Sequence, residues 1–438
     1  ALKYEATSDL AFTFSLDGVD NESGQSPYTI ELTDSLDSND VFNGDFPLLT
    51  EDLIPSNPDD LGTTVAGIES TSYSGWGTSF TADWAINNTY TTKFISSYRT
   101  SEYEGGLDDD ASPLNLSEFP EVGGADQYSF EVQLNATFDK MDFVSGLYFF
   151  NEDGFTRSED FVFSPFNTPN GLLNDGVTPS FGGFGFFEIN QETNSYAAYI
   201  NGSYDLTDDL TIGGGLRYSE DKKDANAIFP SFSERKYISA DFNAVTWDIN
   251  ASYQLSNNMN VYGQVQKGYQ TGGFPPRPFG GPDQFVSFDE TKAVNYEIGL
   301  KGQVHENVSM MLAMFVTDYT DLALPFSDPT AGGGFVTIVE NAGQSKAQGI
   351  ELETTIAITD DFTIRSAVGY LDSEITEVAE GVQGIGKGDS PALTPRWTVM
   401  VAPSYFVDLS NGGTVALNAN YSYRSEMQGQ SVFNKSET

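Results

Sequence analysis

Hydrophobic and polar residues alternate one by one along much of this chain. In residues 291–304 an apolar set alternates with a polar or small set, namely Val294, Tyr296, Ile298 and Leu300 against Asn295, Glu297, Gly299 and Lys301. Residues 210–219, 244–255 and 349–358 repeat the pattern. Successive side chains of a β-strand point to opposite faces. Each segment therefore predicts a strand with one apolar and one polar face.

A short polar segment, such as "ITDDFTI" at 358–364, connects the two predicted strands of each pair. Similar segments occupy residues 6–12, 84–90, 138–144, 206–212, 255–261, 305–311 and 409–415. The side chains of Asp and Asn bond to the nearby backbone, and Asp, Asn and Gly tolerate tight turns, so each segment predicts the short turn of a hairpin. The other connections are long and polar, and we expect them at 22–71, 102–126, 154–193 and 274–288.

The length of the predicted strands indicates their environment. They run for ten or more residues, whereas a strand of a soluble protein has about 5–6 and a tilted membrane-spanning strand about 9–11. An open sheet in lipid would leave backbone groups unpaired, which a closed barrel avoids. The sequence therefore predicts an all-β fold, a transmembrane antiparallel β-barrel with short periplasmic turns and long extracellular loops. The soluble alternative, a β-propeller, needs four short strands per repeat.

Aromatic residues near the loop-side ends of the strands fit a girdle at a membrane interface. The expected members are Tyr218, Tyr269, Tyr319, Tyr370 and Tyr423.

Eight turns imply sixteen strands, from one near Leu2–Ala6 to one at Val415–Arg424. Both outermost strands would then end outside the cell. Bacterial barrels have even strand numbers, so closure with periplasmic termini requires an odd number of further strands at each end. We therefore expect a fragment of a barrel with eighteen or twenty-two strands.

The composition of the chain excludes several kinds of partner and site. The chain carries 64 acidic residues against 20 Lys plus Arg, a net charge of -44, which excludes nucleic acid as its main partner. It has no cysteine and one histidine, His305, expected as a solvated turn residue, so the usual catalytic triads and His- or Cys-based metal sites are excluded. Paired acids such as Asp360 and Asp361 lie in turns, and we predict neither an enzyme nor a cofactor.

One acidic run is the candidate for a metal site. Asp108, Asp109 and Asp110 offer carboxylate oxygens that suit calcium. A solvated acidic loop is the favoured interpretation, and the prediction is of no metal site.

Several segments in order resemble the barrel of TonB-dependent outer-membrane receptors. They are "DQYSFEVQLNA" (126–136), "YAAYINGSYDLTDDLTIGGGLRYSEDKK" (196–223), "VYGQVQKGYQTGGF" (261–274), "FDETKAVNYEIGLKGQV" (288–304) and "VENAGQSKAQGIELETTIAITDDFTIRSAVGYLDSEIT" (339–376). The resemblance covers most of the chain from about residue 70 onward.

The resemblance implies a barrel of twenty-two strands around an N-terminal plug, with a segment before the plug that contacts TonB. Residues 1–438 would be part of the barrel domain, strands four to nineteen, without the plug and the closing strands. The implied partners are the TonB complex, through that missing segment, and the lipid and lipopolysaccharide of the outer membrane of a Gram-negative bacterium.

The implied function is the energy-coupled uptake of a scarce solute. Ferric siderophores, cobalamin, nickel chelates and oligosaccharides are carried by family members, and the sequence does not choose among them. Two other hypotheses stay open: a passive porin or substrate-specific channel, and a surface scaffold or adhesin.

The loop after residue 270 is the candidate ligand-binding segment. Its expected contact residues are Gln270, Phe274, Arg277, Phe279 and Phe285. The phenylalanines supply apolar area, Arg277 is the loop's one positive charge, and its prolines restrict the backbone. A rigid loop that only packs on its neighbours is the alternative.

Overall fold

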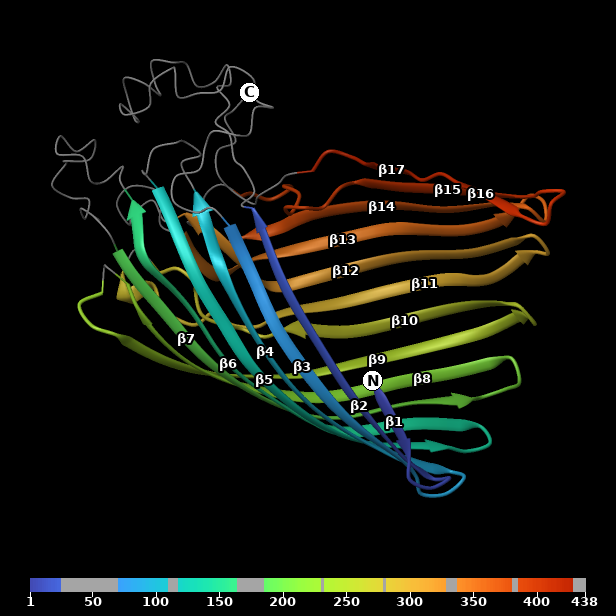
Figure 1. Ribbon diagram of the computed structural model, residues 1–438, viewed down its shortest axis with the longest axis horizontal. Helices are drawn as coiled ribbons and strands as arrows, with labels where there is room; N and C mark the ends of the chain where they lie inside the picture. The colour runs from blue at the N-terminus through green and yellow to red at the C-terminus, as the bar shows by residue number, and fades with distance from the viewer. Residues whose placement is uncertain are drawn as a thin grey trace, which may run out of the picture.

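The computed structural model describes residues 1–24, 70–108, 117–163, 185–229, 232–278, 281–327, 337–379 and 385–427. These residues form one antiparallel sheet (Figure 1). The strands are β1 (Leu2–Glu5), β2 (Leu10–Gly24), β3 (Ser70–Ala85), β4 (Tyr90–Asp108), β5 (Ser117–Thr137), β6 (Met141–Phe163), β7 (Gly185–Asp205), β8 (Leu210–Ile228), β9 (Lys236–Ser256), β10 (Met259–Gln270), β11 (Thr291–His305), β12 (Val308–Ser327), β13 (Thr337–Ala357), β14 (Phe362–Val378), β15 (Trp397–Asp408), β16 (Thr414–Asn418) and β17 (Tyr421–Arg424). Within the described ranges, no helix is long and apolar enough to cross a membrane.

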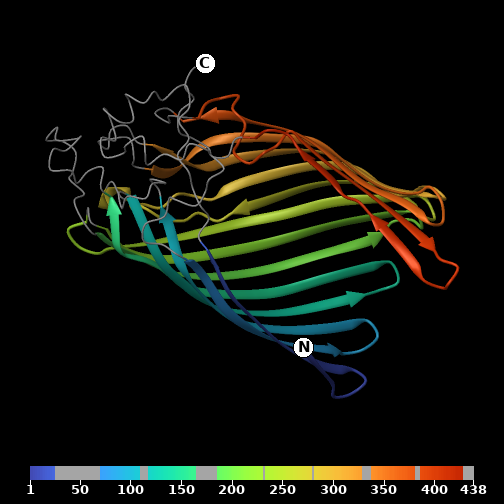
Figure 2. The same cartoon turned by 45° about the horizontal axis from the view of Figure 1, so that its top comes forward.

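Each strand pairs with the next one along the chain, from β1 to β15. The sheet curves strongly, and its two ends, β1–β4 and β14–β17, lie on opposite sides of the structure (Figure 2). In the described residues β1 and the β16–β17 segment do not pair with each other.

The last two segments are halves of one strand. Both pair with β15, through Ser404↔Asn418 on one side and Val401↔Tyr421 on the other. Pro403 lies opposite the gap and has no N–H to donate, so the ladder is interrupted there. The seventeen segments therefore make sixteen strands, which confirms the predicted number.

The eight predicted turns all join neighbouring strands, and they gather at one end of the sheet (Figure 1). Their polar side chains close the turns as expected. The Thr207 hydroxyl accepts from the backbone N–H groups of Asp209 and Leu210, at 3.3 and 3.0 Å. Asn87 accepts from two backbone N–H groups in the same way. His305 is exposed beside one of these turns, as predicted.

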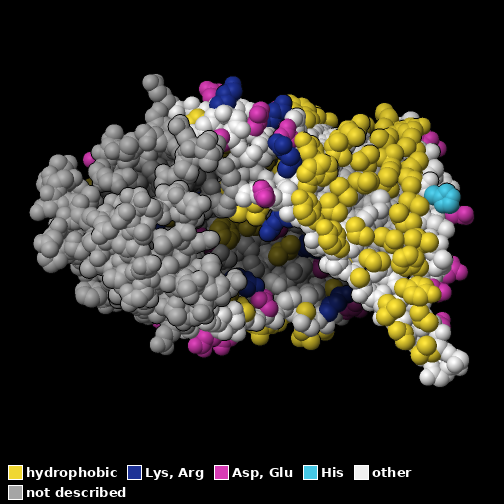
Figure 3. Space-filling view, turned by 90° about the horizontal axis from the view of Figure 1, so that it is seen from above, with side chains coloured by type: hydrophobic (Ala, Val, Ile, Leu, Met, Phe, Trp, Pro, Cys, Tyr) yellow, Lys and Arg dark blue, Asp and Glu magenta, His cyan; other side chains and the backbone are white. Residues whose placement is uncertain are grey.

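The predicted alternation is confirmed, and it marks an apolar belt around the outer face. On β8 the outward residues are apolar or glycine from Leu210 to Tyr218, and then become Glu220, Lys222 and Asp224. The apolar part has about the length a tilted strand needs to cross a bilayer. Ile249, on β9, is 65% exposed in this belt. Figure 3 shows the belt as a broad hydrophobic band.

Aromatic rings border the belt on its loop side. Trp76 contacts Tyr98 with ring centroids 5.2 Å apart, and Tyr98 contacts Tyr128 at 4.9 Å. Phe149 and Tyr196 continue the row, with centroids 5.2 Å apart. Such rings on neighbouring strands are typical of an interfacial girdle.

Two of the five tyrosines predicted for the girdle lie elsewhere. Tyr218, Tyr370 and Tyr423 are on the outer face. The register places Tyr319 on the inner face, opposite Ser345. The Tyr269 hydroxyl donates to Asp221, which is also on the inner face. The prediction was wrong for these two because loop-side position alone does not determine which face a side chain occupies.

The predicted loop 102–126 was also wrong in its extent. Strands β4 and β5 continue through it in register, as far as the pair Asp108↔Glu118. Above the apolar belt both faces of a strand can be polar, so the alternation that identifies a strand is lost while the backbone pairing persists. Strands β6 and β7 likewise enter the predicted loop 154–193.

Candidate functional site

The inner face of the sheet is polar, and its loop-side half carries the candidate site. On β8 the inward residues are Arg217, Ser219, Asp221 and Lys223, in register with inward residues of β7 and β9. Arg217 lies at the loop-side edge of the apolar belt and the other three lie beyond it, which places them near the outer end of the barrel interior.

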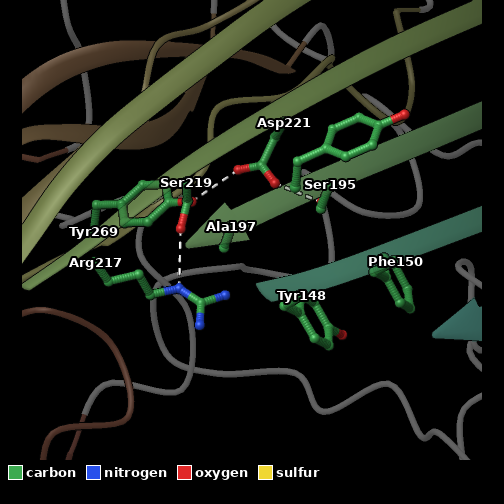
Figure 4. A pocket seen from close by; sticks show the side chains of 9 residues that line it. Tyr148, Phe150, Ser195, Ala197, Arg217, Ser219, Asp221 and Tyr269 are labelled. Atoms are coloured by element: carbon green, nitrogen blue, oxygen red, sulfur yellow. Dashed lines mark hydrogen bonds between the residues drawn. The ribbon is translucent and has the colours of Figure 1, made fainter. Parts of the chain in front are cut away.

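A cavity of about 230 Å³ opens on this part of the inner wall (Figure 4). Its lining comes from β6, β7, β8 and β10, and consists of Tyr148, Phe150, Ser195, Tyr196, Ala197, Arg217, Ser219, Asp221 and Tyr269. Aromatic rings and a few convergent polar groups are the usual composition of a small-molecule site. We refer to it as the wall pocket.

The carboxylate of the wall pocket accepts two hydrogen bonds from its neighbours. The Ser195 hydroxyl donates to Oδ1 of Asp221 at 2.5 Å, and the Tyr269 hydroxyl donates to Oδ2 at 2.9 Å. Asp221 is buried. Each oxygen of this carboxylate accepts one hydrogen bond, so the carboxylate holds Ser195 and Tyr269 in place.

The cation of the wall pocket is only partly engaged. Nε of Arg217 donates to the Ser219 hydroxyl at 3.0 Å. The guanidinium carbon lies 5.6 Å from the centre of the Tyr148 ring and 5.7 Å from that of Tyr199, a cation–π arrangement. The Tyr199 hydroxyl donates to Glu131 at 2.6 Å. Aromatic rings therefore hold the planar guanidinium without using its terminal N–H groups.

The segment between β10 and β11 folds inward over the same wall. We call the described residues 271–278 and 281–290 the strap. Phe274 and Phe285 of the strap pack with inward residues of β7 and β8, and Phe285 is 0% exposed. The cluster consists of Phe187, Ala225, Ala227, Phe229, Phe232, Phe274 and Phe285. Burial of these rings is the main attachment of the strap to the wall.

Polar contacts tie the strap to several strands. Nζ of Lys223 donates to the Gly272 carbonyl at 2.7 Å, and burial lowers the pKa of Lys223. Arg277 pairs with Glu121 of β5, far from β10 in the sheet. The bridge between Gly273 and Phe288 closes the base of the strap. The strap therefore spans the inner wall from β10 to β5.

The predicted contact residues divide into three groups. Gln270 ends β10 and is exposed. Phe274 and Phe285 are buried in the aromatic cluster, so in this conformation their rings pack on the wall. Arg277 remains partly exposed beside Glu121, and Phe279 lies outside the described residues. Their role in binding stays a prediction.

Two of the three candidate metal-binding residues lie outside the described residues. Asp108 is the last residue of β4, and Asp109 and Asp110 lie outside the described residues. Within the described part of the chain, no three His, Asp or Glu side chains are grouped to hold a metal.

The wall pocket was not predicted from the sequence. Arg217 lies in the segment "GGGLRYSED", where it interrupts an inward run of glycine and threonine. A cation that ends an inward run of neutral residues was a usable signal. Its combination with Tyr148 and Tyr269 could not be found without the register of the intervening strands.

Comparisons with known proteins agree with this architecture. Residues 7–436 match the family described as TonB dependent receptor-like, beta-barrel. The chain is 30% identical over 232 residues to the pesticin receptor of Yersinia enterocolitica, covering 48% of this chain and 33% of that protein. It is 23% identical over 199 residues to the probable TonB-dependent siderophore receptor PiuA of Acinetobacter baumannii, covering 43% of this chain and 25% of that protein. The matched region is thus a minor part of each curated relative.

Solved structures share the fold over a longer stretch. The ferric yersiniabactin uptake receptor FyuA from Yersinia pestis superposes with a TM-score of 0.70 at 17% identity, covering 94% of this chain and 56% of that one. The siderophore receptor PiuA from Acinetobacter baumannii gives a TM-score of 0.68 at 17% identity, covering 96% of this chain and 63% of that one. The chain belongs to the TonB-dependent receptor β-barrel family of the bacterial outer membrane.

Proposed function

We propose that this chain forms the barrel wall of a receptor that takes up a ferric siderophore across the outer membrane, with energy supplied through TonB. Relatives of this chain include a probable siderophore receptor and, among solved structures, a ferric yersiniabactin uptake receptor. The observation in this chain that supports the proposal is the wall pocket, an aromatic-lined site with a free guanidinium edge at the outer end of the interior.

The parts of the proposal differ in their support. The family implies three of these parts: a single barrel domain that includes residues 1–438, a plug inside the barrel, and a segment that contacts TonB. The outer-face belt supports contact with membrane lipid and lipopolysaccharide, because its apolar residues would otherwise face water. A passive channel or an adhesin has no specific observation in its favour, and the matched relatives are receptors.

Growth of a deletion strain tests the function directly. Under iron limitation the strain should fail to grow on at least one ferric siderophore that supports the wild type, and a plasmid copy should restore growth. Deletion of tonB in the wild-type background should give the same defect. A defect on a glycan or on cobalamin, with normal growth on every iron source, would contradict the siderophore assignment. Uptake that persists without TonB would indicate a passive channel.

A further inference from the structure

The outer face of β5–β8 carries an apolar groove at the loop-side end of the belt, with a volume of about 390 Å³. The register places Ala198 between Leu147 of β6 and Tyr218 of β8. Because alanine has one side-chain carbon, the surface is lowest over Ala198. The outward residues of this outer groove are Phe130, Val132, Leu147, Phe149, Tyr196, Ala198 and Tyr218.

Aromatic rings border the outer groove on its loop side. The rings of Phe130 and Phe149 stack with centroids 6.3 Å apart, and those of Phe149 and Tyr196 lie 5.2 Å apart. Leu147, on the other side of Ala198 from Tyr218, is 66% exposed. A linear hydrocarbon chain laid over Ala198 would therefore bury apolar surface beneath it and on both sides.

A polar pocket lies on the same outer face, beyond the girdle, with a volume of about 230 Å³. The outward row of β7 leads to it from the groove, since Glu192 lies six residues from Ala198, about 20 Å along the strand. The outward residues of this outer pocket come from β6–β9 and are Asp153, Asn190, Glu192, Asp224, Asn226, Tyr237 and Ser239.

The lining of the outer pocket suits a neutral sugar. The Tyr237 side chain is 73% exposed, and its hydroxyl has no hydrogen-bond partner within the described ranges. An exposed ring can stack on the C–H face of a sugar, while amides, carboxylates and a hydroxyl around it can accept from and donate to sugar hydroxyls.

The charge of the outer pocket argues against other small ligands. Asp153, Glu192 and Asp224 would repel an anionic group. In the part of the chain that the structure describes, no three His, Asp or Glu side chains are grouped to hold a metal. The hydroxyls of a neutral sugar can donate to these carboxylates without adding charge.

We propose that the outer groove and the outer pocket together bind one glycolipid of the outer leaflet. Its acyl chain lies over Ala198, and a neutral sugar of its headgroup lies against Tyr237. The groove continues the belt that contacts lipid, and the long loops of outer-membrane barrels face outside, so this end of the belt lies in the outer leaflet. A phospholipid would fill the groove but leave the pocket empty.

Binding is measured by native mass spectrometry of the purified full-length protein in lauryldimethylamine oxide, a detergent without a sugar. The probes are rough lipopolysaccharide, which carries core sugars, lipid A, which lacks them, and phosphatidylethanolamine. The wild type should bind rough lipopolysaccharide about tenfold or more tightly than phosphatidylethanolamine, because only the former reaches both sites.

Two variants separate the groove from the pocket. Ala198→Trp fills the floor of the groove and should weaken the binding of lipopolysaccharide and of lipid A about tenfold. Tyr237→Ala removes the exposed ring and should weaken lipopolysaccharide binding about tenfold. It should leave lipid A binding unchanged, because lipid A has no core sugar to reach the pocket.

Matched substitutions at the turn-side end of the same face control the experiment. Ala251 and Tyr253 project outward from β9, where they pair with Ile212 and Leu210. Ala251→Trp and Tyr253→Ala should leave every affinity unchanged, and heat modifiability should show that all variants are folded. Equal losses in these controls, unchanged lipopolysaccharide binding in Ala198→Trp or Tyr237→Ala, or equal affinity of the wild type for lipopolysaccharide and phosphatidylethanolamine would overturn the proposal.

The glycolipid site does not depend on which solute the barrel carries, because it lies on the face of the wall away from the interior. Ala198→Trp should therefore support growth on the same ferric siderophores as the wild type. Glycolipid binding that is lost in Ala198→Trp, in a protein whose deletion affects no iron source, would refute siderophore uptake and support the site. Uptake by a protein that shows no preference for lipopolysaccharide would do the reverse.

Discussion

Replacing Phe285 with alanine should loosen the strap while the barrel stays folded. The Phe285 side chain is fully buried against the inner wall. Substitutions of buried phenylalanine by alanine cost about 3–5 kcal/mol, from lost burial and the cavity that remains. The cluster lies beyond the apolar belt, so the loss should fall on the attachment of the strap. At the lower end, a 3 kcal/mol loss corresponds to a more than hundredfold rise in the open population.

Hydrogen exchange measures this opening. The reporters are the amides of Gly273 and Phe288, which bond to each other's carbonyls at 3.1 and 3.0 Å. Their exchange in the full-length protein should accelerate about a hundredfold or more in Phe285→Ala, since exchange follows the local opening free energy. Heat modifiability on a gel should be unchanged.

The neighbouring residue provides the matched control. Val286 is 44% exposed, so Val286→Ala removes apolar side-chain volume without opening the cluster, and exchange at Gly273 and Phe288 should stay near the wild-type rate. If Phe285→Ala and Val286→Ala behave alike, the aromatic cluster is not what holds the strap, and the reasoning from burial fails.

Three other predictions follow from the same structure. Ile249→Arg should impair barrel insertion, because an arginine on the lipid face near the midplane costs about 2–4 kcal/mol, while Asn250→Arg on the inner face should be milder; equal effects in a heat-modifiability gel would reject the assigned faces. Epitope tags after Asp109 or Gly280 should be accessible on intact cells, and tags at Asp360 or Asn257 only after the outer membrane is opened; labelling at Asp360 on intact cells would invert the topology. Arg277→Ala should accelerate exchange of the strap about tenfold or less, since water screens the 41% exposed Arg277 side chain and its ion pair with the more buried Glu121 contributes about 1 kcal/mol; an effect as large as that of Phe285→Ala would show that charge, not burial, holds the strap.

Much of the fold could be predicted from the sequence because its determinants are local. A turn such as 206–209 is closed by its own Thr207, so a few neighbouring letters identify it. The faces of the strands follow from contact with lipid, which requires apolar residues at every second position inside the belt. Where that requirement ends, as on β4 after Tyr98, the pattern ends too, although the strand continues to Asp108.

The candidate site could not be predicted in the same way, because it depends on contacts across several strands. Arg217 meets Tyr148 across β7, and Arg277 meets Glu121 across the four strands β6 to β9. Neither pair has a signature in residue spacing. The sequence analysis selected the aromatic residues of the strap as ligand contacts, but composition alone cannot tell whether a phenylalanine contacts a ligand or the wall.

One residue of the sequence, Gly272, helps to explain why the strap turns inward. Pairing between β9 and β10 ends at Lys267↔Trp247, and the chain then reaches Gly272. A Cβ at Gly272 would lie 2.2 Å from the Phe288 carbonyl oxygen and 2.3 Å from the Phe242 ring, so no larger residue fits where the strap crosses the wall. The same bend carries Tyr269 over the inner face of β9 to Asp221. The position of the strap and the shape of the wall pocket are therefore linked through Tyr269, and a change that moves one should be detectable at the other.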